Sequence, residues 1–146
     1  MRKMLLDINV WVALAFECHL HHVAARNWFD EIGDEDLCLF CRLTQQGFLR
    51  LATNAKALGE DALSMTDAWT AFDAFIADGR IELIGEPANV EGCWRRFTNR
   101  ASRSTDAWSD AWLAAFAVSA DVEFVTFDRG FSQYSGLRAQ ILSEVE

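Results

Sequence analysis

The chain has 146 residues, of which 51% are hydrophobic and 24% charged, and this length suits a single domain spanning 1–146. With one Pro and eight Gly, the composition excludes disordered, collagen-like and low-complexity architectures. A formal net charge of −9 disfavours a protein that binds nucleic acid through a broad basic face, although local basic clusters remain compatible with it.

The pattern of apolar residues also indicates the cellular compartment of the protein. No apolar run reaches the roughly 18 residues that span a membrane, and Asp7 interrupts the segment that a signal peptide would need. We therefore expect a cytoplasmic protein that does not associate with membranes. Without a secretory signal, the four cysteines are expected to be reduced thiols. Their spacing lacks the paired ligand clusters of a structural zinc site. These cysteines are Cys18, Cys38, Cys41 and Cys93.

Short apolar runs alternate with longer segments of helical period. A strand is predicted at residues 3–8, followed by a helix over 21–31, a strand at 37–40 and a helix over 44–54. Next come a helix over 61–78, a strand at 81–84, helices over 90–99 and 104–120, and strands at 123–126 and 138–142. This alternation predicts an α/β fold whose parallel sheet is covered by helices on both faces.

Two aspartates follow predicted strands, where ligands bind in folds of this class. Asp7 lies within an apolar stretch, and an ionised carboxylate there is costly unless it is paired, hydrogen-bonded or bound to a metal. Asp128 follows the strand at 123–126. The alternative for both residues is purely local: Asp7 caps the next turn through backbone N–H groups, and Asp128 is a turn residue.

A third aspartate, Asp110, lies inside the helix predicted over 104–120, which is apolar almost all round. Asp106 precedes it by one turn, and two like charges on one row destabilise a helix unless a cation lies against them. For Asp106 the alternative is an N-terminal cap formed with Ser104 and Thr105. Asp110 lies too deep in the helix for capping.

Clustered carboxylates are how proteins hold hard divalent cations near phosphates. Together, Asp7, Asp110 and Asp128 therefore suggest a Mg²⁺ site. One or two such ions can generate hydroxide for in-line attack on a phosphodiester and can stabilise the leaving oxygen.

Four segments resemble, in this order, those of PIN-domain nucleases, and more narrowly the VapC toxins of bacterial type II toxin–antitoxin modules. The segments are 5–11 with Asp7 and Asn9, 43–50 with Thr44, Gly47 and Arg50, 110–117 with Asp110, and 125–131 with Thr126 and Asp128. The resemblance runs nearly end to end.

The resemblance implies a three-layer α/β/α sandwich with a mostly parallel central sheet. It also implies a Mg²⁺- or Mn²⁺-dependent endoribonuclease that cleaves RNA phosphodiester bonds. The expected assembly is a homodimer neutralised by a cognate VapB-like antitoxin, whose C-terminal segment crosses the cleft. Asp7, Asp110 and Asp128 fall on the family's first, third and fourth acidic positions, as catalytic and metal-binding residues. Asn9 and Thr126 are expected to orient ligands or water.

One position departs from the family pattern. Its second acid is usually a Glu, and Gln45 holds that place here, offering a carbonyl oxygen without a charge. Asp106 can restore the missing charge directly or through water, unless it serves only as a helix cap. Arg50 can reach the cleft or, alternatively, pair with Asp61.

Two further features suggest binding surfaces. Four arginines precede the helix of Asp110, and they suit RNA phosphates with Trp94 or Phe97 stacking a base; the alternative is a solvated helix face. They are Arg95, Arg96, Arg100 and Arg103. An apolar stripe exceeds what one core is expected to cover, which predicts a dimer interface. Its members are Trp69, Phe72, Phe75 and Ile76.

Two other functions are alternatives to the toxin hypothesis. A catalytically weakened PIN-like binding module, acting with its antitoxin in autoregulation, is favoured by the missing Glu and opposed by the three retained aspartates. A haloacid-dehalogenase-like phosphatase built on Asp7 is disfavoured, because that chemistry needs a second Asp where Asn9 stands.

Overall fold

A five-stranded sheet divides the molecule, which is described over residues 1–143 in a computed structural model. Every pair of neighbouring strands is parallel, in the order β3-β2-β1-β4-β5. The strands are β1 (Lys3–Leu6), β2 (Leu37–Phe40), β3 (Ile81–Leu83), β4 (Glu123–Thr126) and β5 (Ala139–Ile141). The chain builds β1, β2 and β3 outward in one direction and then returns to add β4 and β5 on the other side. The strand order therefore reverses between β1 and β4.

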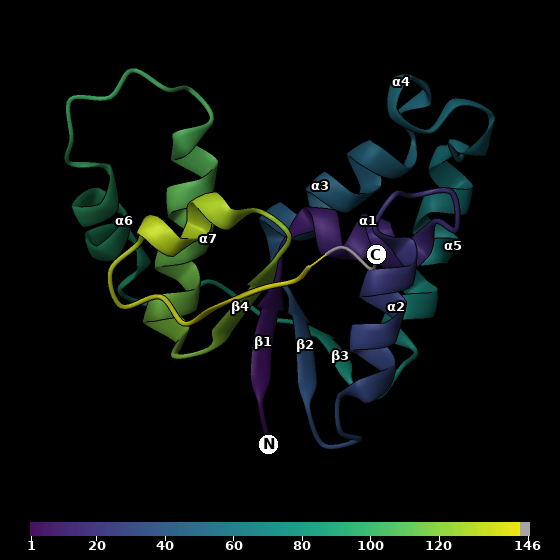
Figure 1. Cartoon of the computed structure of the whole chain (residues 1–146), viewed down its shortest axis with the longest axis horizontal. Helices are drawn as coiled ribbons and strands as arrows, with labels where there is room; N and C mark the ends of the chain where they lie inside the picture. Colours follow the sequence, from purple (N-terminus) through teal and green to yellow (C-terminus); the bar gives the residue numbers. More distant parts are fainter. Residues whose placement is uncertain (144–146) are drawn as a thin grey trace.

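Helices cover both faces of this sheet (Figure 1). The α-helices are α1 (Ile8–Ala15), α2 (His22–Glu31), α3 (Arg42–Ala52), α4 (Ala55–Leu58), α5 (Met65–Ile76), α6 (Val90–Thr98) and α7 (Ala107–Ala120). Two 3₁₀ turns are η1 (Gly59–Asp61) and η2 (Arg129–Gln133). One apolar cluster packs α1, α2, α3 and α5 on one face, and a second packs α6, α7 and η2 on the other. The three-layer α/β/α sandwich is confirmed.

The sequence-based elements are confirmed except in three places. The strand expected at residues 3–8 ends at Leu6, and the unpredicted helix α1 follows at once. Helix α1 escaped prediction because it is apolar except for Asn9, so it lacks the amphipathic period that marks a surface helix. The helix expected over 61–78 begins only at Met65, because the Ser64 hydroxyl caps it by accepting from the backbone N–H of Asp67 at 3.1 Å.

The third difference concerns the helix expected over 104–120, which begins at Ala107. Asp106 occupies the cap position, but its side chain accepts no capping hydrogen bond. The alternative role of Asp106 at the start of this helix is therefore confirmed in position but not in the side-chain hydrogen bond. Among residues 1–143, no helix has the length and apolar character needed to cross a membrane.

Helices α1 and α3 approach each other closely at Gly47. A Cβ at this position would overlap Ile8 Cδ1 and lie 2.6 Å from Ile8 Cγ1. Gly47 is buried inside α3, where glycine is otherwise an unfavourable helix residue. The close contact between the two helices explains why a glycine stands there.

We expect Gly47→Ala to lower the free energy of unfolding by about 1–3 kcal/mol, because overpacking at Ile8 outweighs the gain in helix propensity. Chemical denaturation of the purified variant measures this change. Adding Ile8→Ala should recover part of the loss, because it removes the atoms that clash. A Gly47→Ala protein as stable as the parent would contradict the close-approach explanation.

Candidate active site

Asp7 links β1 to α1 at the point where the strand order reverses. Its backbone N–H donates to Val125 O at 2.9 Å, which extends the pairing of β1 with β4 by one bond. Its carboxylate is only 8% exposed. Oδ1 accepts from the Ile8 N–H at 2.8 Å, and Oδ2 accepts from the Thr126 hydroxyl at 2.7 Å. The helix-capping role and the hydrogen-bonded buried carboxylate are thus both present.

Burial raises the pKa of Asp7 from 3.8 to about 6. The hydrogen bonds from Thr126 and Ile8 oppose this shift, whereas the negative charges of Asp110 and Asp128 add to it. Desolvation is the largest of these effects, so the ionised form of the Asp7 carboxylate is destabilised by its burial.

Thr126 organises the end of β4. Its buried Oγ1 donates to Asp7 and accepts from the Asp128 N–H at 3.0 Å. The Asn9 amide donates to the same oxygen at 3.5 Å, and Asn9 Oδ1 accepts from the Phe127 N–H at 3.4 Å. These bonds join the ends of β1 and β4, and among them only the bond from Thr126 reaches a carboxylate, that of Asp7.

Asp110 and Asp128 complete the group. Asp128 Oδ1 accepts from the Gly130 N–H at 2.8 Å, which confirms its role in the turn after β4. Asp110 is half-buried in the first turn of α7, and its pKa is raised mainly by burial and then by Asp128 and Asp106. None of the three carboxylates forms an ion pair with Lys or Arg in the part of the chain that the structure describes. Three uncompensated acids suit a bound cation.

In residues 1–143, no three His, Cys, Asp or Glu side chains are gathered closely enough to enclose an ion by themselves. This arrangement suits Mg²⁺, which commonly keeps several waters and takes only one or two carboxylates directly. The four cysteines are free thiols, and burial raises the pKa of Cys38 to about 12.

Gln45 is buried in α3, and its carbonyl oxygen accepts a hydrogen bond from Arg42 Nη1 at 2.6 Å. Sequence reasoning missed Arg42, although its place one turn before Gln45 was a signal. Where the resemblance led us to expect a second acid, the structure therefore has the Gln45 amide bonded to the Arg42 guanidinium. Arg50 is exposed beside Ile8 and Gly47 and forms no ion pair with Asp61 among the described residues.

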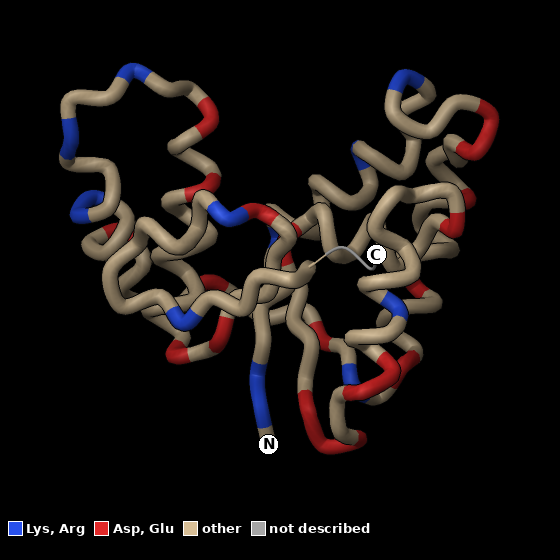
Figure 2. The backbone as a smooth tube through the Cα atoms, in the orientation of Figure 1, with Lys and Arg blue, Asp and Glu red and all other residues tan. Residues whose placement is uncertain are grey.

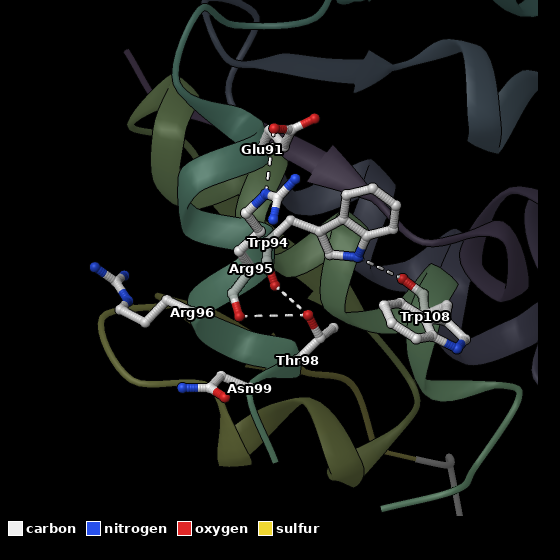
Figure 3. Close-up of a pocket in the computed structure, with 7 residues that line it drawn as sticks. All are labelled: Glu91, Trp94, Arg95, Arg96, Thr98, Asn99 and Trp108. Atoms are coloured by element: carbon white, nitrogen blue, oxygen red, sulfur yellow. Dashed lines mark hydrogen bonds and ion pairs between the residues drawn. The ribbon is translucent and has the colours of Figure 1, made fainter. Parts of the chain in front are cut away.

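The four predicted arginines lie on α6 and the loop that follows it, visible as blue segments in the left lobe (Figure 2). Arg95 pairs with Glu91 at 3.3 Å, and Arg100 donates to Gln133 at 2.6 Å. Arg96 lies 5.1 Å from the Phe97 ring centre, and Arg103 is exposed in the loop. Phe97 packs on Tyr134, whereas Trp94 lines an open groove with Trp108 (Figure 3). Trp94 is therefore the better placed of the two aromatics suggested for base stacking.

The apolar stripe expected on α5 is only partly exposed. Phe72 is buried and Phe75 packs against Trp11, so neither is available to a partner. Trp69 and Ile76 remain 49% and 38% exposed, and Met65 adds 80% exposure at the start of the helix. The exposed stripe is therefore Met65, Trp69 and Ile76.

Comparison with known proteins shows to which family the chain belongs. Residues 4–137 match the PIN domain. Ribonuclease VapC41 of Mycobacterium tuberculosis is 44% identical over 145 residues, which cover 97% of this chain and 99% of that relative. The chain belongs to the VapC family of PIN-domain proteins.

Other relatives agree with this assignment. Ribonuclease VapC38 of M. tuberculosis is 33% identical, with 86% of this chain and 85% of the relative covered. The solved VapBC2 complex from Rickettsia felis contains a chain that matches with a TM-score of 0.69 at 12% identity, covering 97% of this chain and 99% of that one. At that identity the likeness concerns the fold.

We expect Asp7→Asn to stabilise the metal-free VapC chain at neutral pH. An acid whose pKa is raised in the folded state favours folding below its unfolded value of 3.8, and this contribution is lost as the pH rises through about 6. The full shift corresponds to about 3 kcal/mol. The variant's stability advantage should therefore narrow as the pH falls from about 7 to about 4.

Denaturation in EDTA across this pH range measures the difference. Asp34→Asn, at an exposed acid before β2, is the control, and its stability should not exceed that of the parent at neutral pH. A less stable Asp7→Asn protein at neutral pH would show that the hydrogen bonds of Asp7 outweigh its desolvation.

Proposed function

We propose that this chain is the toxin of a type II toxin–antitoxin module, an endoribonuclease that depends on Mg²⁺ or Mn²⁺. The observation that carries the proposal is that Asp110 and Asp128 lie close enough to Asp7 to raise its pKa, near the reversal of strand order, without any Lys or Arg partner for the three among the described residues. Relatives named as ribonucleases, at up to 44% identity over nearly the whole chain, support RNA as the substrate.

In this proposal, Asp7, Asp110 and Asp128 hold the divalent ion. A divalent ion bound by these carboxylates, directly or through water, would supply the chemistry of a hydroxide nucleophile at neutral pH and would stabilise charge on the leaving oxygen. Thr126 keeps the Asp7 carboxylate aimed by donating to Oδ2, and Asn9 fixes the backbone beside Asp128. The raised pKa of Asp7 predicts that acidification removes a ligand charge as the pH falls through about 6.

Gln45, at the place of the family's second acid, is the reason for an alternative function. Because Gln45 is neutral and bonded to Arg42, it adds no negative charge to the site. Asp106 is exposed, lacks a capping bond and raises the pKa of Asp110, so it is close enough to contribute charge to the ion. If it does not compensate, the chain is the weakened binding module that acts with its antitoxin in autoregulation.

We expect RNA cleavage in Mg²⁺ or Mn²⁺ that EDTA abolishes, and a decrease of at least about 100-fold in Asp7→Asn and Asp110→Asn. Gel analysis of a labelled RNA measures the rate. Asp34→Asn should cleave as fast as the parent. Undiminished cleavage by both active-site variants would remove these carboxylates from the mechanism, and RNA binding without cleavage by the parent would favour the binding module.

We also propose a homodimer and a VapB-like antitoxin as partners. Solved VapBC complexes from Salmonella typhimurium and Haemophilus influenzae resemble this fold and support the antitoxin. The exposed stripe of Met65, Trp69 and Ile76 on α5 supports a protein interface.

Light scattering at tens of micromolar should give twice the 16.5 kDa chain mass. Trp69→Lys should shift the mass toward one chain, because a charge buried without a partner in an apolar interface is unfavourable. Trp108→Lys, at a similarly exposed tryptophan on α7, should leave the dimer intact. A monomeric parent protein would refute the dimer.

A further inference from the structure

Three tryptophans form a groove that the proposed catalytic step does not use. Two adjoining hollows, of about 740 and 350 Å³, share Trp94 and Trp108. The larger extends over α6 to Arg95 and Arg96, and the smaller reaches Trp112 and Arg42 at the start of α3. We call this continuous surface the Trp–Arg groove.

The tryptophans are held in a defined arrangement. Trp94 Nε1 donates to the backbone oxygen of Trp108 at 2.9 Å, and the two rings meet edge to face with centres 6.0 Å apart (Figure 3). Trp94 is half-buried, but the Trp108 side chain remains 56% exposed. An indole of this size is normally covered, so its exposure marks a surface that binds something.

One end of the groove reaches the residue that precedes Asp110 on α7. Ser109 lines its smaller hollow, and the next residue is Asp110. On the opposite wall, Arg42 is held by Gln45, the residue that replaces the family's second acid. The groove is thus one residue away from Asp110 along α7, within reach of an RNA strand that is bound there.

The charges of the groove point to phosphate. Arg42, Arg95 and Arg96 line it together with Glu91, which pairs with Arg95 at 3.3 Å, so that Arg42 and Arg96 are the two arginines of the groove without an ion-pair partner among residues 1–143. This cluster of positive charge lies on a protein whose net charge is −9. Local arginines alternating with open indole faces are typical of surfaces that bind single-stranded nucleic acid.

We propose that the Trp–Arg groove binds an unpaired segment of the RNA substrate next to the cleaved bond. A base stacks on Trp108, while Arg42 and Arg96 contact the flanking phosphates. Because a paired base cannot leave its helix without losing its own stacking, the groove selects single-stranded or loop RNA over duplex. This inference rests on the proposed ribonuclease function and adds the substrate's conformation to it.

The test measures RNA affinity separately from cleavage. A short fluorescein-labelled RNA of mixed sequence is titrated in EDTA, both single-stranded and annealed to its complement. The parent should prefer the single strand. Trp108→Ala should weaken single-strand binding roughly 5- to 100-fold, and Trp108→Phe should retain most of it, because the phenyl ring still stacks. Trp108 is exposed, so both variants are expected to fold, and thermal unfolding verifies this.

A charge variant tests the phosphate contact independently. Arg96→Gln should reduce the slope of log affinity against log salt by about 1. Arg26→Gln is the matched control, because Arg26 is a half-exposed arginine of α2, on the opposite face of the sheet. It should leave both the affinity and the salt slope unchanged.

The outcomes separate this inference from the function on which it rests. If the parent cleaves RNA but Trp108→Ala binds it equally well, the groove proposal is wrong and the ribonuclease proposal stands. If that variant instead weakens only the complex with a co-expressed antitoxin, the groove is a protein-docking surface and the RNA proposal is again overturned. A parent protein that neither binds nor cleaves RNA would overturn both.

Discussion

The buried carboxylate of Asp7 is the constraint on which the active edge of this fold depends. Asp7 follows the last residue of β1 and caps the first turn of α1. Two hydrogen bonds, from the Ile8 N–H and the Thr126 hydroxyl, offset part of the cost of desolvating its carboxylate. Replacing it with an apolar residue would ease that cost but leave the Thr126 hydroxyl and the first amide of α1 without their partner. The chain thus keeps an acid where the folded state alone would favour a neutral group, which is expected where binding a cation matters more than stability.

Thr126 transmits this constraint across the sheet. One hydroxyl serves Asp7, Asp128 and Asn9, so the ends of β1 and β4 cannot separate without losing several bonds at once. The parallel register that pairs Leu6 with Val125 fixes their relative height. The position of Asp7 therefore follows from the pairing of β1 with β4, whereas Asp128 is also held by the turn that follows β4.

Much of the fold was accessible from the sequence, because short apolar strands and amphipathic helices carry distinct periods. Helix α1 was not, since a short, mostly buried helix with Asn9 as its one polar residue has no polar face to reveal it. Asp7 and Asp128 were predicted from their positions after strands, Asp110 from its place in an otherwise apolar helix, and all three from family resemblance. The Arg42–Gln45 bond was missed because it depends on side-chain orientation, and the half-burial of Phe75 was missed because only the packed core shows that Trp11 already covers it.

The hydrogen bond from Trp94 to the backbone of Trp108 ties α6 directly to α7. The loop between these helices, residues 99–106, therefore does not have to maintain the spacing of the tryptophans. Its sequence and length are free to diverge while the groove walls and the carboxylates stay in register. In this chain, the residues that the loop presents beside the groove can therefore change without a compensating change in the sheet.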